Sequence, residues 1–142
     1  MEKTFRQIDQ TMDDAIADLV TLCSFASTKD NKEATFSCAE WLKARFERAG
    51  FETRLLQVPG SYPLVYASLD GDTDRRLLCF NHYDVEIIEK PDEWMSPPFD
   101  PVVRNGHIYG RGTADNKGNI IARLCAVEAT LRTRGSLPYG VV

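Results

Sequence analysis

The spacing of apolar residues changes twice along this chain, and this change constrains the fold more than any other feature. Residues 4–25 and 36–49 carry apolar side chains three and four positions apart, which is the spacing of helices. Residues 51–55 alternate apolar with polar positions and predict a strand, and residues 64–69 predict another. Helical spacing returns at residues 120–131. Helices that alternate with strands predict a layered α/β domain.

Capping and turn residues mark the expected ends of these elements. Asp30 or Asn31 is expected to cap the second helix, and Gly50 is expected to end it. Gly135 is expected to end the third helix, before a last strand at residues 137–142. The expected hairpin turns are Asp70-Gly71-Asp72, before residues 77–80, and Asn105-Gly106, between residues 102–104 and 107–109.

A continuous apolar run, Leu77–Phe80, predicts a central strand that is buried on both faces. The connection that follows it, residues 81–105, is rich in proline and acidic residues. Connections of this length are usually functional or disordered. Trp94 and Phe99 lie between prolines, and we expect them to pin this connection onto the domain rather than to line a pocket.

The composition excludes several classes of protein. The chain has 142 residues, 43% of them hydrophobic and 27% charged, which is the balance of one globular domain. The net charge of -4 is not that of a nucleic-acid-binding protein, and no apolar stretch approaches the length of a membrane span. The polar, acidic start, residues 1–14, is not a secretory signal. We expect a cytoplasmic protein with reduced thiols at Cys23, Cys38, Cys79 and Cys125.

The first candidate constellation is His82-Tyr83-Asp84, directly after the apolar run. Ligands of open α/β sheets bind beyond the carboxyl ends of strands, and residues two apart in an extended segment face the same side. His82 could therefore ligate a metal while Asp84 holds its other ring nitrogen. The triplet alone fits a surface histidine beside an acidic loop at least as well. His107, the only other histidine, is expected to be a partly exposed strand residue.

The second constellation is the glycine-rich turn Gly110–Gly118, which opens the third helix. A phosphate-binding turn is one interpretation. The dinucleotide fingerprint, however, requires glycine where Asp115 stands, and the P-loop pattern requires Ser or Thr where Gly118 stands. The carboxylate of Asp115 suits a cation better than a phosphate, and its two oxygens could span two metal ions. The alternative that Asp115 merely caps the helix is equally consistent with its position.

Together these segments resemble the zinc-dependent family of aminoacylases, deacylases, dipeptidases and glutamate-releasing carboxypeptidases. The resemblance covers essentially the whole chain, and its wording is most similar to the dipeptidase and carboxypeptidase branch. It rests on His82-Tyr83-Asp84-Val85, Trp94, Pro98-Phe99-Asp100-Pro101, Asn105-Gly106-His107-Ile108-Tyr109-Gly110-Arg111-Gly112 and Asp115-Asn116-Lys117-Gly118, in this order and spacing.

The resemblance implies a three-layer αβα sandwich with a mixed sheet that is incomplete in this chain. It implies that His82 ligates one zinc, that Asp115 bridges two zincs with a cis peptide to Asn116, and that Asp84 is the catalytic-site aspartate that orients His82. Cobalt or manganese could replace zinc. The implied reaction is hydrolysis of a peptide or N-acyl amide bond by a zinc-activated water, with a peptide or N-acyl amino acid as the substrate.

The chain departs from the family pattern because residues 1–142 would supply only the amino-terminal portion of one catalytic domain. The Glu-Glu pair that provides the general base, the later ligands and the lid domain all follow in the family. We therefore expect little or no hydrolase activity from this chain alone. Two alternatives remain: a non-catalytic truncated piece that associates, for example as a homo-oligomer, through an open sheet edge, and a nucleotide-binding module that uses the Gly110–Gly118 turn.

Overall fold

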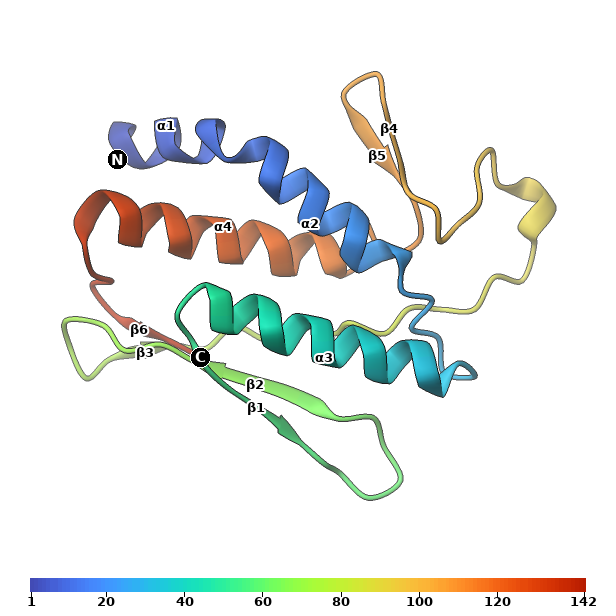
Figure 1. The fold of residues 1–142 in the computed structure, drawn as a ribbon, viewed down its shortest axis with the longest axis horizontal. Coiled ribbons are helices and arrows are strands. Elements are labelled where there is room, and N and C mark those ends of the chain that lie inside the picture. Colours follow the sequence, from blue (N-terminus) through green and yellow to red (C-terminus); the bar gives the residue numbers. More distant parts are fainter.

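A computed structural model describes all residues of the chain, 1–142, as helices that pack together over small sheets (Figure 1). The four α-helices lie on one side of strands β1, β2, β3 and β6 in Figure 1, and the β4–β5 hairpin projects at the opposite end of the molecule. The α/β class is confirmed. In chain order the elements are α1 Glu2–Gln10, α2 Met12–Ser24, α3 Lys32–Arg48, β1 Glu52–Leu56, β2 Leu64–Ser68, β3 Arg76–Leu77, η1 Pro91–Glu93, β4 Val102–Arg104, β5 His107–Tyr109, α4 Lys117–Arg134 and β6 Gly140–Val141.

The first predicted helix is divided into two. Thr11 separates α1 from α2, and its hydroxyl donates to the carbonyl of Gln7 at 3.0 Å. A threonine hydroxyl that bonds back to the preceding turn competes with the helical backbone and often bends a helix. Helical spacing continues across Thr11, so the apolar pattern alone does not show the break.

The predicted caps are confirmed. Asn31 caps α3, because its side-chain oxygen accepts from the backbone N–H of Ala34 at 3.1 Å. Gly50 follows α3 with a φ of 93°, and Gly135 follows α4 with a φ of 82°. Only glycine adopts this left-handed backbone without a steric penalty, so both helices end where glycine allows the chain to turn.

Strands β1 and β2 form an antiparallel ladder in which Leu55 lies opposite Val65. The last strand, β6, pairs in parallel with β3 and meets the end of β2 through an antiparallel bridge between Leu69 and Val141. The spatial order is therefore β1-β2-β6-β3, and the sheet is mixed. The β4–β5 hairpin forms at the predicted turn, where Asn105 and Gly106 both have positive φ, at 51° and 75°.

The predicted hairpin across Asp70-Gly71-Asp72 is wrong, because β6 lies between the two strands that it was expected to join. Gly71 permits this insertion. A Cβ at Gly71 would lie 2.3 Å from the backbone carbon of Tyr139, so only glycine lets β6 approach the loop so closely.

The prediction that Leu77–Phe80 is a strand buried on both faces is also wrong. Strand β3 covers only Arg76 and Leu77, and Leu77, Leu78 and Phe80 are 59%, 75% and 81% exposed. A central strand is buried by layers on both faces, whereas an apolar hollow separates this short pair of strands from α4. The apolar run thus lies at an open end of the sheet.

The core joins the helices to one another. Leu22 of α2, Cys38 and Leu42 of α3, and Ile120 and Ile121 of α4 form one buried cluster. All four cysteines are free. None of the helices is long and apolar enough to cross a membrane.

A charged cluster ties the same three helices together. The Arg45 guanidinium of α3 donates to Asp18 of α2 at 2.5 Å and to both carboxylate oxygens of Glu128 of α4 at 2.8 Å. The Arg45 side chain is only 8% exposed, so these bonds operate where water screens them little. Two-pronged contacts between guanidinium and carboxylate have defined geometry, and they therefore set how α2, α3 and α4 lie relative to one another.

Replacement of Arg45 by alanine should lower the free energy of unfolding by about 3 kcal/mol, because the partly buried Glu128 loses its counter-charge and Asp18 keeps only the exposed Arg48. Arg54→Ala is the matched control: Arg54 pairs with Glu52 on the surface, where solvent screens the pair, so its loss should leave the free energy of unfolding almost unchanged. Urea unfolding followed by circular dichroism measures both variants. Equal losses would mean that the Arg45 cluster does not hold the helices together.

Candidate metal centre

The structure brings together the two residues that the sequence analysis assigned to a metal. His82 lies in the segment after β3, and Asp115 lies in the turn before α4, 33 residues later. The His82 Nε2 atom is 3.0 Å from Asp115 Oδ1. Both side chains are open to solvent, at 45% and 83% exposure. The site is therefore an accessible pair of an imidazole and a carboxylate.

Asp84 lies at the other ring nitrogen of His82. The Nδ1 atom is 3.0 Å from the Asp84 backbone carbonyl and 3.3 Å from its carboxylate oxygen Oδ1. A carbonyl can only accept, so this contact places the Nδ1 proton toward Asp84 and leaves Nε2 as the nitrogen with a free lone pair when the ring is neutral. The carbonyl thus has the closer contact with the ring, and the carboxylate lies beside it.

The surroundings of His82 favour its protonated ring. Partial burial lowers the pKa, but the hydrogen bonds to the Asp84 carbonyl and to the Asp115 carboxylate outweigh it, so the pKa of His82 lies above its ordinary value. The same acceptors would attract a divalent cation.

The donor chemistry fits a metal such as zinc in kind, because imidazole nitrogen and carboxylate oxygen are both common zinc ligands. The number of donors, however, is smaller than the three or four protein ligands that a zinc site normally has. No group of three or more His, Cys, Asp or Glu side chains in residues 1–142 is arranged so that it could hold a metal ion. The chain therefore offers two donors of a metal centre rather than a closed one.

Asp115 does not cap α4, although its position allowed that interpretation. The cap residue is Asn116, and no side-chain cap bond is made there. The peptide between Asp115 and Asn116 is cis, as the resemblance implied. The exposed Asp115 carboxylate would repel a phosphate at this end of α4, which disfavours the nucleotide-binding alternative.

Lys117 fixes the Gly110–Gly118 turn to the end of α2, a role that the sequence pattern did not predict. Its side chain is fully buried, and its Nζ atom donates to the carbonyls of Leu22 at 3.0 Å and Phe25 at 2.8 Å. The last carbonyls of a helix lack helical partners and carry partial negative charge, so an ammonium at the end of α2 is stabilised there. Burial lowers the pKa of the Lys117 ammonium.

The His82 segment is anchored through Ser27, which follows α2. The buried Ser27 hydroxyl donates to the Tyr83 carbonyl at 2.7 Å, and the Val85 N–H donates to the Ser27 carbonyl at 2.9 Å. The Tyr83 hydroxyl donates in turn to the Pro63 carbonyl at 2.6 Å. Tyr83 and Val85 therefore face inward, which leaves His82 and Asp84 on the exposed side.

A polar network joins the two halves of the site directly. Asn81 bonds through its side chain to Asn116 and to Arg123 of α4. The Arg123 guanidinium also donates to the Phe80 carbonyl at 3.1 Å. These bonds connect the residue before His82 with the residue after Asp115, so they control the spacing of the two donors.

Two glycines of the turn are required by close packing. At Gly112, where φ is 88°, a Cβ would lie 3.0 Å from the side chains of Lys117 and Val85. At Gly118 a Cβ would lie 2.1 Å from the backbone oxygen of Thr113, which is closer than atoms can approach. The glycine pattern of the turn therefore serves backbone packing around Lys117.

The remaining sequence predictions also have clear positions. His107 is exposed in β5, as expected, and its Nδ1 contacts the Asn105 carbonyl at 2.8 Å. Trp94 is half-buried and lies under the Arg111 guanidinium, 5.2 Å from ring centre to Cζ. The Arg111 N–H donates to the Pro98 carbonyl at 2.7 Å, which ties the long connection to the turn.

Replacement of Gly118 by alanine should cost about 1–3 kcal/mol of unfolding free energy, the typical penalty of overpacking, because the new methyl group collides with the Thr113 carbonyl. Asn119→Ala changes an exposed neighbour in the first turn of α4 and should stay within about 0.5 kcal/mol. Urea unfolding compares the two variants. A Gly118→Ala protein as stable as the Asn119→Ala protein would contradict the described packing of the turn.

The chain resembles known proteins in sequence. Residues 78–142 match Peptidase family M20/M25/M40, and the match includes His82, Asp84 and Asp115. A succinyl-diaminopimelate desuccinylase of Nitrosospira multiformis is 41% identical over 93 residues, which are 65% of this chain and 24% of that protein.

Two solved structures resemble the whole fold. Human carnosine dipeptidase 1 has a TM-score of 0.87 at 25% identity, over 99% of this chain and 33% of its own. The M20 family metallo-carboxypeptidase Sso-CP2 from Sulfolobus solfataricus has a TM-score of 0.83 at 31% identity, over 89% of this chain and 29% of its own. The chain spans about a quarter to a third of the length of these relatives. With the family match, the shared fold and the paired donors, the chain belongs to peptidase family M20/M25/M40.

Proposed function

We propose that this chain is the amino-terminal portion of the catalytic domain of a metal-dependent hydrolase that cleaves peptide or N-acyl amide bonds. The observation that carries the proposal is the 3.0 Å approach of His82 Nε2 to Asp115 Oδ1 from two separate segments. Relatives support the bond type: their names describe a desuccinylase, a dipeptidase and a carboxypeptidase. A dipeptidase or carboxypeptidase-like reaction on a peptide or N-acyl amino acid is the form that we favour.

In this proposal His82 and Asp115 hold zinc, for which cobalt or manganese could substitute, and Asp115 is shared between two ions. Bound zinc would supply a water of lowered pKa and would polarise the carbonyl of the substrate. Asp84 is the positioning residue, since it holds the Nδ1 side of the ring while Nε2 faces Asp115. The Lys117, Ser27 and Asn81 contacts keep the two donors at a fixed spacing. All four free thiols suit a cytoplasmic setting, which is part of the proposal.

Zinc titration by calorimetry tests the ligand assignment. His82→Ala and Asp115→Ala should each weaken zinc binding at least about tenfold, since each removes one of two donors from a site that normally needs three protein ligands. His107→Ala is the matched control, because it removes the only other imidazole and lies away from the pair. Unchanged affinity in His82→Ala, or an equal loss in His107→Ala, would contradict the assignment.

The chain alone should show little or no hydrolysis. Two donors hold a metal weakly, because a catalytic zinc normally has three protein ligands. Assays with a dipeptide and with an N-acetyl amino acid, each with added zinc, should give rates equal to the protein-free blank. Tight binding of two zinc ions with measurable turnover would overturn this expectation.

The second candidate, a non-catalytic association module, is favoured by one observation. Leu78 and Phe80 are 75% and 81% exposed at the open end of the sheet, beside an apolar hollow of about 550 Å³ between the strands and α4. Exposed apolar surface of this kind marks contacts with other chains. Sedimentation of the unmodified chain and of His82→Ala at several concentrations tests this candidate. Self-association of equal strength in both proteins would show that the contact between chains does not depend on the metal site.

A further inference from the structure

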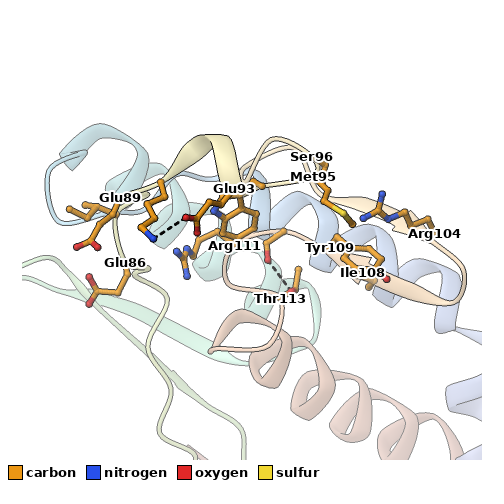
Figure 2. A pocket seen from close by; sticks show the side chains of 14 residues that line it. Glu86, Glu89, Glu93, Met95, Ser96, Arg104, Ile108, Tyr109, Arg111 and Thr113 are labelled. Carbon is orange, nitrogen blue, oxygen red and sulfur yellow. Dashed lines mark hydrogen bonds and ion pairs between the residues drawn. The ribbon is translucent and has the colours of Figure 1, made fainter.

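Figure 2 shows the side chains that line a second hollow, of about 740 Å³. Its walls come from the long connection, from the β4–β5 hairpin and from the turn that carries Asp115. It borders the metal site at two points. Glu86 and Thr113, which line it, are each two residues from a site residue, Asp84 and Asp115.

The side chains of this segment alternate in exposure, which shows how the hollow adjoins the site. Val85 is buried, whereas Asp84 and Glu86 on either side of it are exposed. Side chains two residues apart in such a segment project from the same side of the backbone. The side of the chain that carries His82 and Asp84 therefore continues directly into the wall of the hollow.

Arg111 differs from the other cations of this hollow. Lys90 pairs with Glu93 at 2.9 Å, and Arg104 lies 4.3 Å from the centre of the Tyr109 ring. The Arg111 guanidinium rests on Trp94 and makes no side-chain hydrogen bond or ion pair, and its Nε is buried without any acceptor. Buried guanidinium donors without acceptors are rare in proteins, and a planar guanidinium matches a carboxylate with two parallel bonds.

Two carboxylates face Arg111 across the hollow. Figure 2 shows Glu86 and Glu89 on one side of Arg111, with Arg104 and Tyr109 on the other side. Neither Glu86 nor Glu89 forms an ion pair, and both are exposed. They make the hollow unfavourable for a multiply charged anion such as phosphate, because like charges repel, while a single carboxylate can still pair with the Arg111 guanidinium that the Trp94 ring supports.

We propose that this hollow is a substrate subsite in which Arg111 binds the carboxylate of a peptide or N-acyl amino acid against Trp94. The description of the hollow as a substrate subsite rests on the proposed hydrolase function. The carboxylate binding itself rests only on the unpaired guanidinium, its aromatic support and the hollow. Arg111 is then a specificity-determining residue that favours substrates with one free carboxylate at this distance from the metal centre.

The test uses N-acetylglycine and N-acetylglycinamide, which differ in the carboxylate alone. In nitrogen–proton NMR spectra of the metal-free chain, N-acetylglycine should shift the Arg111 Nε–H and Trp94 indole N–H signals, with a Kd on the order of 1 mM. N-acetylglycinamide and inorganic phosphate should leave both signals in place. Equal shifts with the amide, or stronger binding of phosphate, would overturn the proposal.

Matched variants separate Arg111 from general charge. Arg111→Gln should weaken N-acetylglycine binding at least about fivefold, whereas Arg104→Gln, which removes the same charge from the same hollow, should weaken it by less than about twofold, because Arg104 makes no direct bond to the carboxylate. Glu89→Gln should tighten binding, because it removes a repulsive charge. An equal loss in both arginine variants, or no loss in Arg111→Gln, would contradict the subsite. The ligand comparison on the unmodified chain decides the question if Arg111→Gln does not fold.

Zinc titration distinguishes failure of the subsite from failure of the proposed function. Arg111→Gln should bind zinc as the unmodified chain does, and His82→Ala should bind N-acetylglycine normally. If Arg111→Gln binds N-acetylglycine as tightly as the unmodified chain, while His82→Ala and Asp115→Ala weaken zinc binding as expected, the subsite is rejected and the hydrolase proposal stands. If Arg111→Gln weakens N-acetylglycine binding, while His82→Ala and Asp115→Ala leave zinc binding unchanged, the hydrolase proposal is rejected and a carboxylate-binding hollow remains.

Discussion

The buried ammonium of Lys117 is the contact on which the arrangement of this chain depends. It begins α4, yet it bonds to the carbonyls of Leu22 and Phe25 at the end of α2, so it joins two helix ends of opposite partial charge. Because Lys117 lies two residues after Asp115, this contact also fixes the position of Asp115, the candidate metal ligand, relative to the helices of the core. Gly112 is free of a side chain because Lys117 passes beneath it.

The candidate metal centre is assembled from segments that lie far apart in the sequence. Ser27 holds the strand-end segment from one side, and Asn81 bonds it to Asn116 from the other. His82 and Asp115 meet because both segments are fixed to the ends of helices that share one core. The chemistry proposed here therefore depends on helix packing at a distance from the donors, with the Arg45 cluster as its second support.

Much of the architecture was predictable from residue patterns, and the failures have a common cause. Helix caps at Asn31 and glycine stops at Gly50 and Gly135 are local, because backbone torsion and short-range hydrogen bonds decide them. The break at Thr11, the exposed Leu78 and the insertion of β6 beside β2 are non-local or context-dependent. An apolar run predicts burial only when other layers are available to cover it, and spacing alone carries no information about those layers.

The sequence by itself determined the family, since the resemblance rests on the order and spacing of His82, Asp84, Trp94, the Gly110–Gly118 turn and Asp115. It could not reveal Lys117 as the support of the turn or Arg111 as an unpaired cation, because both roles depend on partners far along the chain or on their absence. Only the tertiary structure decides which donors are satisfied. The physical reason is that hydrogen bonds and ion pairs form between neighbours in space, whereas a pattern records neighbours in sequence.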